Sequence, residues 1–300
     1  MTNEQINMIK TAAKDCGCRC DENILLSGFT TFGIGGKCPL MIEVNGEESL
    51  KTLLPIMNDI PFYVIGKGSN LLISDRDIDM IFLHMGRDIS SISLNGDHLT
   101  CGAGASLSLA GTFAKNNSLT GLEFAYGIPG NIGGAVYMNA GAYGGEIKQV
   151  LTKVEYIEDG AVCSVEPEDS DLGYRFSRFA APERIVLSAE FSLSPDDGMT
   201  KERMKDYSER RRAKQPLTYP SAGSTFKRPA GYYAGALIEQ ADLKGVSVGG
   251  AEVSTLHAGF IINKGGATSE DVKRLIELVQ ERVYENSGVT LETEVKFIGR

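Results

Sequence analysis

Long apolar runs are missing from this chain of 300 residues. No stretch approaches ~18 consecutive apolar residues, so we expect no transmembrane helix and no membrane partner. The N-terminal stretch MTNEQINMIKTAAKDC has neither the apolar region nor the cleavage site of a signal peptide, and this predicts a cytoplasmic protein. The net charge of −9 argues against nucleic acid as a partner, because binding to phosphates favours a basic face.

Histidine is also scarce, and a metal centre finds few ligands in this sequence. The three histidines, His84, His98 and His257, lie outside the motifs described below, and we expect them to be structural. In the cluster CGCRC (16–20) the alternate spacing suits a tetrahedral site poorly, and no histidine or second cysteine pair completes it. We therefore expect no metal site, and free thiols at Cys16, Cys18, Cys20, Cys38, Cys101 and Cys163.

Three common catalytic and nucleotide-binding motifs are absent as well. In YPSAGSTFKRP (219–229), Ser224 follows Gly223 directly and has no glycine two residues later, so it does not form the elbow of a serine hydrolase. A Walker loop needs Gly-Lys before Ser or Thr, and neither Gly36-Lys37 nor Gly66-Lys67 meets this condition. The dinucleotide fingerprint G-x-G-x-x-G also fails after Gly66, and we see no alternation of strands and helices that would accompany it.

The hydrophobic pattern predicts an α+β protein. Helices are expected before residue 27, at 48–59 with a break or end at Pro55, and at 106–117, 199–214, 234–243 and 269–288. Strands are expected at 61–66, 79–85, 89–94, 98–104, 150–158, 161–167, 184–193, 257–263 and 289–299. Asn95-Gly96 and Asp159-Gly160 are typical hairpin turns. The turn cluster SPDDG (194–198) indicates a domain boundary.

Glycine is the residue in excess, with 35 among 300 residues, and ten of them lie in three short stretches. These are GKGSN (66–70), GAG (102–104) and IPGNIGGAVYMNAGAYGGEI (128–147). Each offers backbone N–H groups without a side chain in the way, and such groups can bind a pyrophosphate. Any one of them alone is more typical of a tight turn. The three together favour a large ligand of the dinucleotide type.

Six motifs in order make the chain resemble a known family. They are TTFGIGG (30–36), VIGKGSNLLISD (64–75), GLEFAYGIPGNIGGAVYMNAGAYGGEI (121–147), GYRFS (173–177), YPSAGSTFKRP and LETEVKFIG (291–299). With these motifs the sequence is similar to the UDP-N-acetylenolpyruvoylglucosamine reductases, the MurB family. The short interval between GYRFS and YPSAGS resembles the compact type II form.

The resemblance implies a fold and a reaction. The fold would be an FAD-binding part of the vanillyl-alcohol-oxidase type at 1–195, in two subdomains of about 1–86 and 87–195, and a UDP-sugar domain at 196–300. The reaction would be the NADPH-dependent reduction of UDP-N-acetylglucosamine enolpyruvate to UDP-N-acetylmuramate in peptidoglycan synthesis. The resemblance implies non-covalent FAD and small-molecule substrates, and we expect a monomer.

The same resemblance assigns the glycine stretches to FAD. The segments 66–71 and 128–134 would approach the pyrophosphate, and 139–143 would line the flavin. The residues expected to bind the cofactor are Gly66, Lys67, Gly68, Ser69, Asn70, Leu71, Gly102, Ala103, Gly104, Ile128, Pro129, Gly130, Ile132, Gly133, Gly134, Asn139, Gly141, Ala142 and Tyr143.

Three residues would carry the chemistry. Arg175 in GYRFS is suited to stabilise an enolate that carries a neighbouring carboxylate, because a guanidinium binds a carboxylate in a bidentate manner. Arg178 fits a surface salt bridge better. By resemblance, Glu294 acts with Arg175 on the enol, and Ser224 donates the proton. Glu292 is expected on the same strand face as Glu294, directed to solvent.

The cationic stretch RRRAKQ (210–215) offers partners for a UDP diphosphate. Lys214 is the first candidate to bind the substrate, with Arg228 and Gln240 as further ones. Helix-terminal charges are the alternative explanation for this stretch. Two other functions stay open: a flavin oxidase or dehydrogenase of the same superfamily acting on an alcohol, and a non-catalytic flavin or sugar-nucleotide binding module.

Overall fold

A computed structural model describes residues 1–299, which divide into two compact units. The first unit comprises Met1–Ile24, Pro39–Gly66 and Asp79–Glu209, and the second comprises Leu25–Cys38, Lys67–Ile78 and the chain from Arg210 onward. The sequence predicted one border at 195/196, whereas this division falls at 209/210 and moves two earlier segments into the second unit. They belong there because Phe32, Ile34 and Leu72 are buried in the second hydrophobic core.

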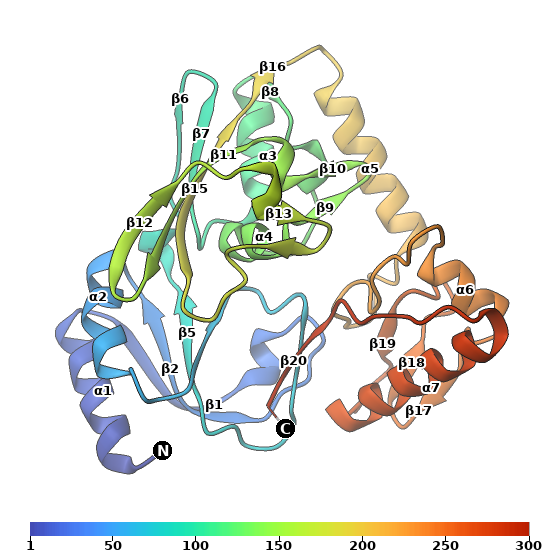
Figure 1. The fold of residues 1–300 in the computed structure, drawn as a ribbon, viewed down its shortest axis with the longest axis horizontal. Helices are drawn as coiled ribbons and strands as arrows, with labels where there is room; N and C mark the ends of the chain where they lie inside the picture. The colour runs from blue at the N-terminus through green and yellow to red at the C-terminus, as the bar shows by residue number, and fades with distance from the viewer. Residues whose placement is uncertain (300) are drawn as a thin grey trace. The chain divides into compact units, whose positions relative to one another are not determined.

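The first unit contains a four-stranded sheet with the order β1-β2-β5-β3 (Figure 1). Its strands are β1 (Arg19–Leu25), β2 (Lys37–Val44), β5 (Ile81–Met85) and β3 (Phe62–Ile65). Both β2 and β3 run parallel to β5, and helix α2 (Glu47–Ile56) joins β2 to β3. This is a strand–helix–strand crossover, so the expectation of no such alternation was wrong. The strand at Lys37–Val44 was not predicted from the sequence, because it contains Pro39, and proline weakens the prediction of a strand.

Helix α1 (Asn3–Asp15) packs beside α2 in this part of the first unit (Figure 1). A capping box formed by Thr2 and Gln5 starts α1, and its buried face carries Ile9 and Ala13. The helix expected before residue 27 ends at Asp15, and strand β1 follows it. Helix α2 passes through Pro55 and ends one residue later, at Ile56.

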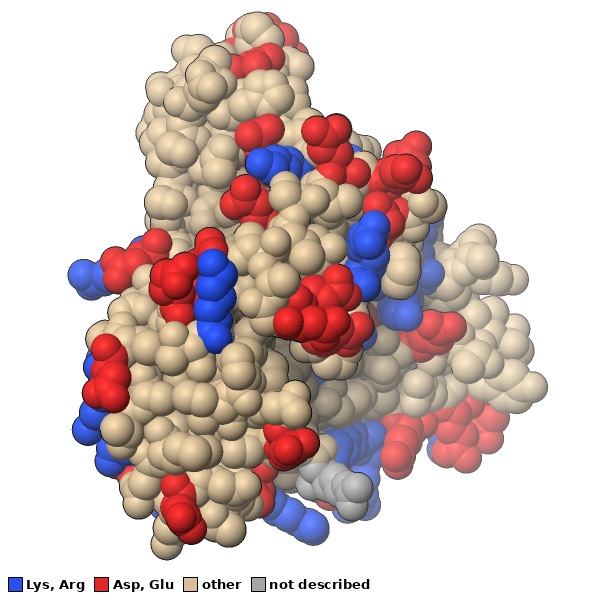
Figure 2. Space-filling model, turned by 60° about the vertical axis from the view of Figure 1, so that its left-hand side comes forward, with Lys and Arg blue, Asp and Glu red and all other residues tan. Residues whose placement is uncertain are grey.

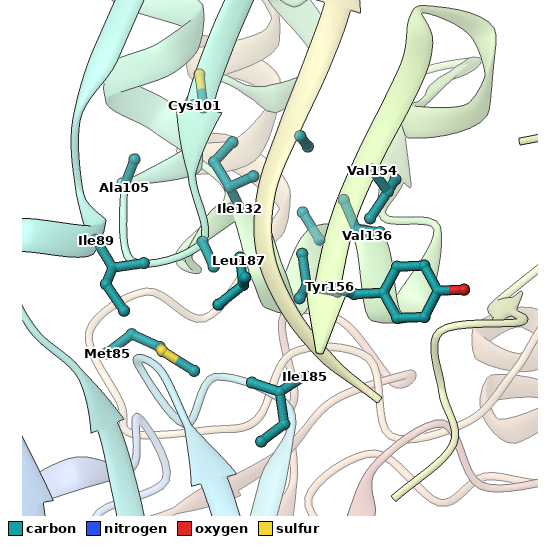
Figure 3. Close-up of a cluster of buried hydrophobic side chains, with 14 of the residues drawn as sticks. Met85, Ile89, Cys101, Ala105, Ile132, Val136, Val154, Tyr156, Ile185 and Leu187 are labelled. Atoms are coloured by element: carbon teal, nitrogen blue, oxygen red, sulfur yellow. The ribbon is translucent and has the colours of Figure 1, made fainter. Parts of the chain in front are cut away.

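A five-stranded antiparallel sheet forms the rest of this unit's core, with the order β12-β11-β15-β7-β6. Its strands are β6 (Ile92–Asn95), β7 (His98–Gly102), β11 (Leu151–Glu158), β12 (Ala161–Val165) and β15 (Ile185–Ser192). Helix α4 (Ile132–Met138) packs on β15 and β7, and Figure 3 shows Ile132 and Val136 among the buried side chains of these strands. Burial in this cluster raises the pKa of the Cys101 thiol to about 12.

The first unit also contains several short elements. They are α3 (Leu107–Asn116), β8 (Leu119–Thr120), β9 (Gly141–Ala142), β10 (Gly145–Glu146), β13 (Leu172–Gly173), β14 (Phe176–Ser177) and β16 (Ser194–Pro195). The strands pair as β9 with β10, β13 with β14 and β8 with β16. Helix α5 (Thr200–Lys214) begins in the first unit and ends in the second.

The second unit has a sheet of β17 (Ser247–Val248), β18 (Ala251–Val253) and β19 (Ile261–Asn263) with helices α6 (Ala234–Gln240) and α7 (Ser269–Ser287). Thr268 caps α7 at its start and Gly288, with a φ of +71°, ends it, as predicted. Strand β4 (Leu71–Ile73) pairs in parallel with β20 (Lys296–Ile298).

Two sequence expectations in this unit need correction. Residues 71–73 form a strand where no strand was expected, and the strand expected at 289–299 is reduced to Lys296–Ile298. Glu292 and Glu294 therefore lie in an irregular segment, in which Leu291 and Val295 are buried. Hydrogen bonds to distant residues hold this segment, and it does not pair as a continuous β-strand. An alternating sequence pattern is the same in both cases and cannot distinguish them.

Among the described residues, no helix combines the length and hydrophobicity needed to cross a membrane. Acidic side chains are spread over the face shown in Figure 2, with basic side chains interspersed among them. All six cysteines are free thiols, and residues 1–299 contain no group of three or more potential ligands suited to a metal ion.

Candidate active site

Arg175 occupies the tip of the hairpin formed by β13 and β14 in the first unit. Its φ is +55°, a left-handed conformation that costs a non-glycine residue roughly 1–2 kcal/mol. The guanidinium Nη2 donates a hydrogen bond to the carbonyl of Gly141 at 3.2 Å, and the guanidinium carbon lies 5.2 Å from the centre of the Tyr174 ring. Strained positions of this kind cluster at active sites.

Two polar side chains hold this hairpin to helix α4. Asn139, which is fully buried at the C-terminal end of α4, donates from Nδ2 to the carbonyl of Gly173 at 2.9 Å. On the opposite limb, the buried Ser177 hydroxyl donates to the carbonyl of Tyr137 at 3.0 Å. Both limbs that carry Arg175 are therefore fixed to one helix.

Asn139 was expected to line the flavin, but its amide is already used within the protein. Nδ2 also donates to Glu146 Oε2 at 3.1 Å, and Oδ1 accepts from the backbone N–H of Lys148 at 2.9 Å. With no exposed surface, this side chain organises the loop that follows α4. Tyr143 in that loop has a φ of +55° and stacks on Tyr207 of α5, with ring centres 4.5 Å apart; the sequence contained no signal for this partner.

Ser224 lies half-buried in a loop of the second unit, directly after Gly223, whose φ is +75°. Two hydrogen bonds attach the start of this loop to Thr31. Thr31 Oγ1 donates to the carbonyl of Ser221 at 2.7 Å, and the Ser221 N–H donates to the Thr31 carbonyl at 3.1 Å. TTFGIGG, recognised only as a family motif, thus supports the serine loop.

Glu294 belongs to the same unit, and its backbone is held from two sides. Its N–H donates to the carbonyl of Thr225 at 2.8 Å, and its carbonyl accepts from Asn70 Nδ2 at 3.1 Å. The structure therefore brings Glu294 next to the residue that follows Ser224. Asn70, expected at the cofactor, contributes to this support.

The cationic side chains of the second unit differ in their contacts. Lys227 pairs with Glu292 at 3.1 Å, so its charge is already balanced, and Glu292 is exposed as predicted. Arg228 lies over the Tyr233 ring, 4.0 Å from its centre. Lys214 and Gln240 are exposed at the ends of α5 and α6 in the second unit.

Arg178, the control for Arg175, forms the expected salt bridge. Its Nη1 lies 3.3 Å from Asp171 Oδ1. The histidines also have partners within the protein. His98 Nδ1 lies 3.1 Å from Glu190 Oε1, and His257 Nδ1 accepts a hydrogen bond from the Gly259 N–H at 3.1 Å. His84 is partly buried, and this burial lowers its pKa.

The glycine stretches divide into positions required by packing and positions open to a ligand. An added Cβ at Gly68, which has a φ of +56°, would lie 2.2 Å from the carbonyl oxygen of Phe29. At Gly66 it would lie 2.6 Å from Asn131 Oδ1. Gly134, in the first turn of α4, is exposed and has no atom within 4 Å of an added Cβ. Bare backbone of this kind lets a dinucleotide phosphate approach, so the residues here fit FAD.

The segment 102–104 is an exception. The N–H groups of Gly102, Ala103 and Gly104 donate to the carbonyls of Ser91, Leu187 and Ile89 at 2.9, 2.8 and 2.8 Å. The expectation that these N–H groups are exposed was therefore wrong. The segment is buried and supports α4 instead, because the carbonyls of residues 103 and 105 accept from the first N–H groups of that helix.

A further pair in the first unit escaped the sequence reading. Glu123, which is 7% exposed, accepts hydrogen bonds at Oε1 from Arg203 of α5, at 2.9 Å from Nε and 2.6 Å from Nη2. Burial would raise the pKa of Glu123, but hydrogen bonds from Thr120, Gly121 and Arg203 outweigh it and lower that pKa. This pair fastens the start of α5 beside the segment that leads into the glycine-rich region.

Comparison with known proteins assigns both parts of the chain. Residues 39–165 match the family model described as "FAD binding domain". Residues 215–298 match the model described as "UDP-N-acetylenolpyruvoylglucosamine reductase, C-terminal domain". The first match confirms the predicted FAD-binding α+β fold and FAD as the cofactor.

Relatives match over nearly the whole chain. A UDP-N-acetylenolpyruvoylglucosamine reductase of Syntrophomonas wolfei is 47% identical over 90% of this chain and 92% of its own. A reductase of the same name from Clostridium novyi is 44% identical over 92% of this chain and 91% of its own. The crystal structure of the reductase from Thermus caldophilus superimposes with a TM-score of 0.83 at 35% identity, covering 94% of this chain and all of the other.

Fold and cofactor domain thus define an FAD-dependent oxidoreductase. The relatives narrow the class further. The chain belongs to the UDP-N-acetylenolpyruvoylglucosamine reductase family, as its six motifs predicted.

Proposed function

We propose that this enzyme reduces UDP-N-acetylglucosamine enolpyruvate to UDP-N-acetylmuramate, with NADPH as reductant, in the cytoplasmic synthesis of peptidoglycan precursors. The observation that carries the proposal is the hydrogen bond from the Glu294 N–H to the carbonyl of Thr225, the residue after Ser224, inside the part that matches the reductase C-terminal domain. The first unit would hold FAD, and the second unit would bind the substrate.

The reaction adds a hydride to one carbon of the enolpyruvyl double bond and a proton to the other. FAD, when bound, accepts the hydride from NADPH and supplies it to the substrate. The protein must then hold the negative charge that spreads over the neighbouring carbon and the substrate carboxylate. One preorganised donor in such a position contributes about 3–4 kcal/mol to the transition state.

Arg175 would bind this carboxylate through its guanidinium. The hydrogen bond to Gly141 and the fixed hairpin hold the side chain before the substrate arrives. Arg178, three residues later, is occupied by Asp171 and cannot substitute for it. We expect Arg175→Lys to lose most activity, because an ammonium does not bind a carboxylate in a bidentate manner.

Ser224 would donate the proton, and Glu294 would act with Arg175 on the enol. Their common attachment to Thr225 keeps the hydroxyl and the carboxylate in one segment of the second unit. Since Lys227 is paired with Glu292, Lys214 and Arg228 are the cations we assign to the diphosphate of the substrate, with Gln240 as a hydrogen-bonding partner. We further propose that FAD is bound without a covalent link, at Gly66–Leu71, Ile128–Gly134 and Gly141–Tyr143, in an enzyme that acts as a monomer.

The test combines steady-state and single-turnover measurements on the purified flavoprotein. Oxidation of NADPH should depend on UDP-N-acetylglucosamine enolpyruvate, and acid should release the flavin. Consumption of NADPH without that substrate, or flavin that remains attached after denaturation, contradicts the proposal and favours an oxidase of the same superfamily.

The serine has its own test. Ser224→Ala should leave flavin reduction by NADPH intact and slow reoxidation by the enolpyruvyl substrate by ~10²–10⁴-fold, the usual range for a lost general acid. Ser221→Ala, in the same loop, is the matched control and should reoxidise at the wild-type rate. Equal rates for both variants would exclude Ser224 as the proton donor.

A further inference from the structure

Thr225 uses every polar atom it has within the second unit. The residue is 2% exposed. Its N–H donates to the carbonyl of Gly259 at 2.9 Å, its Oγ1 accepts from the Ile261 N–H at 3.1 Å, and its carbonyl accepts from the Glu294 N–H at 2.8 Å and the Val295 N–H at 3.5 Å. Three chain segments that are far apart in sequence therefore meet at one residue, two of them at its backbone and one also at its hydroxyl.

We propose that Thr225 is a positioning residue that sets the placement of Ser224 relative to Glu294 for the proton transfer. The inference rests on the proposed function, because it takes these two residues as proton donor and carboxylate. Its basis is covalent geometry: the Thr225 N–H lies in the same rigid peptide plane as the carbonyl of Ser224. The bond to Gly259 thus restrains the peptide plane that joins Ser224 to Thr225.

The opposite end of Thr225 fixes Glu294. The carbonyl that accepts from the Glu294 N–H lies one residue after Ser224, so the two residues are joined by one short stretch of backbone and one hydrogen bond. Asn70 holds the other side of Glu294 through its carbonyl. Both backbone polar groups of Glu294 are therefore occupied.

The hydroxyl of Thr225 is the reason that this arrangement requires a particular residue at position 225. Backbone bonds could be made by any residue, but Oγ1 satisfies the buried Ile261 N–H, and two heavy atoms on Cβ restrict the side chain to few rotamers. Gly259 is in turn anchored through its N–H to His257 Nδ1 at 3.1 Å. Removing the hydroxyl leaves a buried N–H without a partner, and the 259–261 segment has to shift.

The experiment compares Thr225→Val with Thr225→Ser and with Thr200→Val. The valine variant keeps the shape and loses the hydroxyl, and the serine variant restores it. Thr200 is also 2% exposed and uses its hydroxyl in a hydrogen bond, to Asp196 in the first unit, so its valine variant controls for a general loss of stability. In the holoenzyme, flavin reduction by NADPH and reoxidation by UDP-N-acetylglucosamine enolpyruvate are measured separately.

Thr225→Val should slow reoxidation roughly 10–100-fold, as expected when reacting groups move by about 1 Å, with flavin reduction unchanged. Thr225→Ser should recover most of the rate, and Thr200→Val should keep it. Independently of activity, amide hydrogen exchange at Ile261 and Glu294 should accelerate in Thr225→Val alone.

Reoxidation at the wild-type rate in Thr225→Val would overturn the inference. So would an equal loss of rate in Thr200→Val, since this would indicate stability and not placement. A wild-type enzyme that does not reduce the enolpyruvyl substrate refutes the proposed function instead, so the two failures are distinguishable.

Discussion

The exchange Asn139→Asp removes two hydrogen-bond donors from the support of Arg175 while leaving the shape of the side chain almost unchanged. Aspartate tolerates the left-handed backbone at this position, where φ is +42°, and can still accept from the Lys148 N–H. An ionised aspartate can donate neither to the carbonyl of Gly173 nor to the carboxylate of Glu146, and a protonated one can donate to only one of them. The substitution therefore tests the hydrogen bonds and not the packing.

The expected loss follows from these two contacts. A buried carbonyl left without a donor costs about 1–3 kcal/mol. Two charges at the 3.1 Å of the present contact with Glu146 would repel by about 5 kcal/mol at an effective dielectric constant of about 20. Since this exceeds the free energy of taking up a proton, we expect the new carboxyl to stay largely neutral and the free energy of unfolding to fall by about 3–4 kcal/mol.

The sign of the pH dependence follows from the same contacts. The pKa of the new carboxyl is raised in the folded state above its unfolded value, so its favourable contribution is present at low pH and is lost as the pH rises through the folded pKa. The deficit of Asn139→Asp relative to the wild type should therefore shrink when urea unfolding is repeated about two pH units below neutrality.

Asn117→Asp is the matched control, because Asn117 also donates to a backbone carbonyl, that of Phe113, but is exposed at the end of α3. We expect a change within about 0.5 kcal/mol. If Asn139→Asp is as mild as this control, or if its deficit grows on acidification, then Asn139 does not support the Arg175 hairpin as described. Turnover should fall together with stability in Asn139→Asp, because the hairpin that carries Arg175 loses a hydrogen bond to helix α4.

Three further variants probe other parts of the structure. Arg203→Met should lower the free energy of unfolding by about 3 kcal/mol because it leaves the buried carboxylate of Glu123 unpaired, whereas Arg178→Met should cost at most about 1 kcal/mol in the same urea titration. Burial lowers the pKa of His257 in the folded state, so the wild type should lose stability as the pH falls below about 6.5, and His257→Asn should show a shallower slope. Gly134→Ala should melt with the wild type, since its Cβ meets no protein atom, yet bind FAD more weakly in a fluorescence titration of the apoprotein; unchanged affinity would place the cofactor elsewhere.

Local signals sufficed for most helices and hairpins. The hairpin at Asp159-Gly160 formed as expected because both residues adopt positive φ, at +51° and +77°, which these residue types tolerate. Helix α7 could be bounded from its cap residues alone. Strands β1, β2 and β4 were missed. For β2 and β4 the reason is that parallel strands owe their stability to partners distant in sequence, here β5 and β20.

For the site, the motifs in the printed chain named Arg175, Ser224 and Glu294 and the family, and the comparisons confirmed the family. They contained no information on what holds these residues. That Asn139 braces the arginine hairpin, that Lys227 is neutralised by Glu292, and that Thr225 joins the serine to the glutamate are results of chain segments meeting after folding. Residue chemistry is readable one position at a time, whereas positioning is a property of hydrogen bonds between positions as distant as 139 and 173 or 225 and 294, and only the folded chain brings those together.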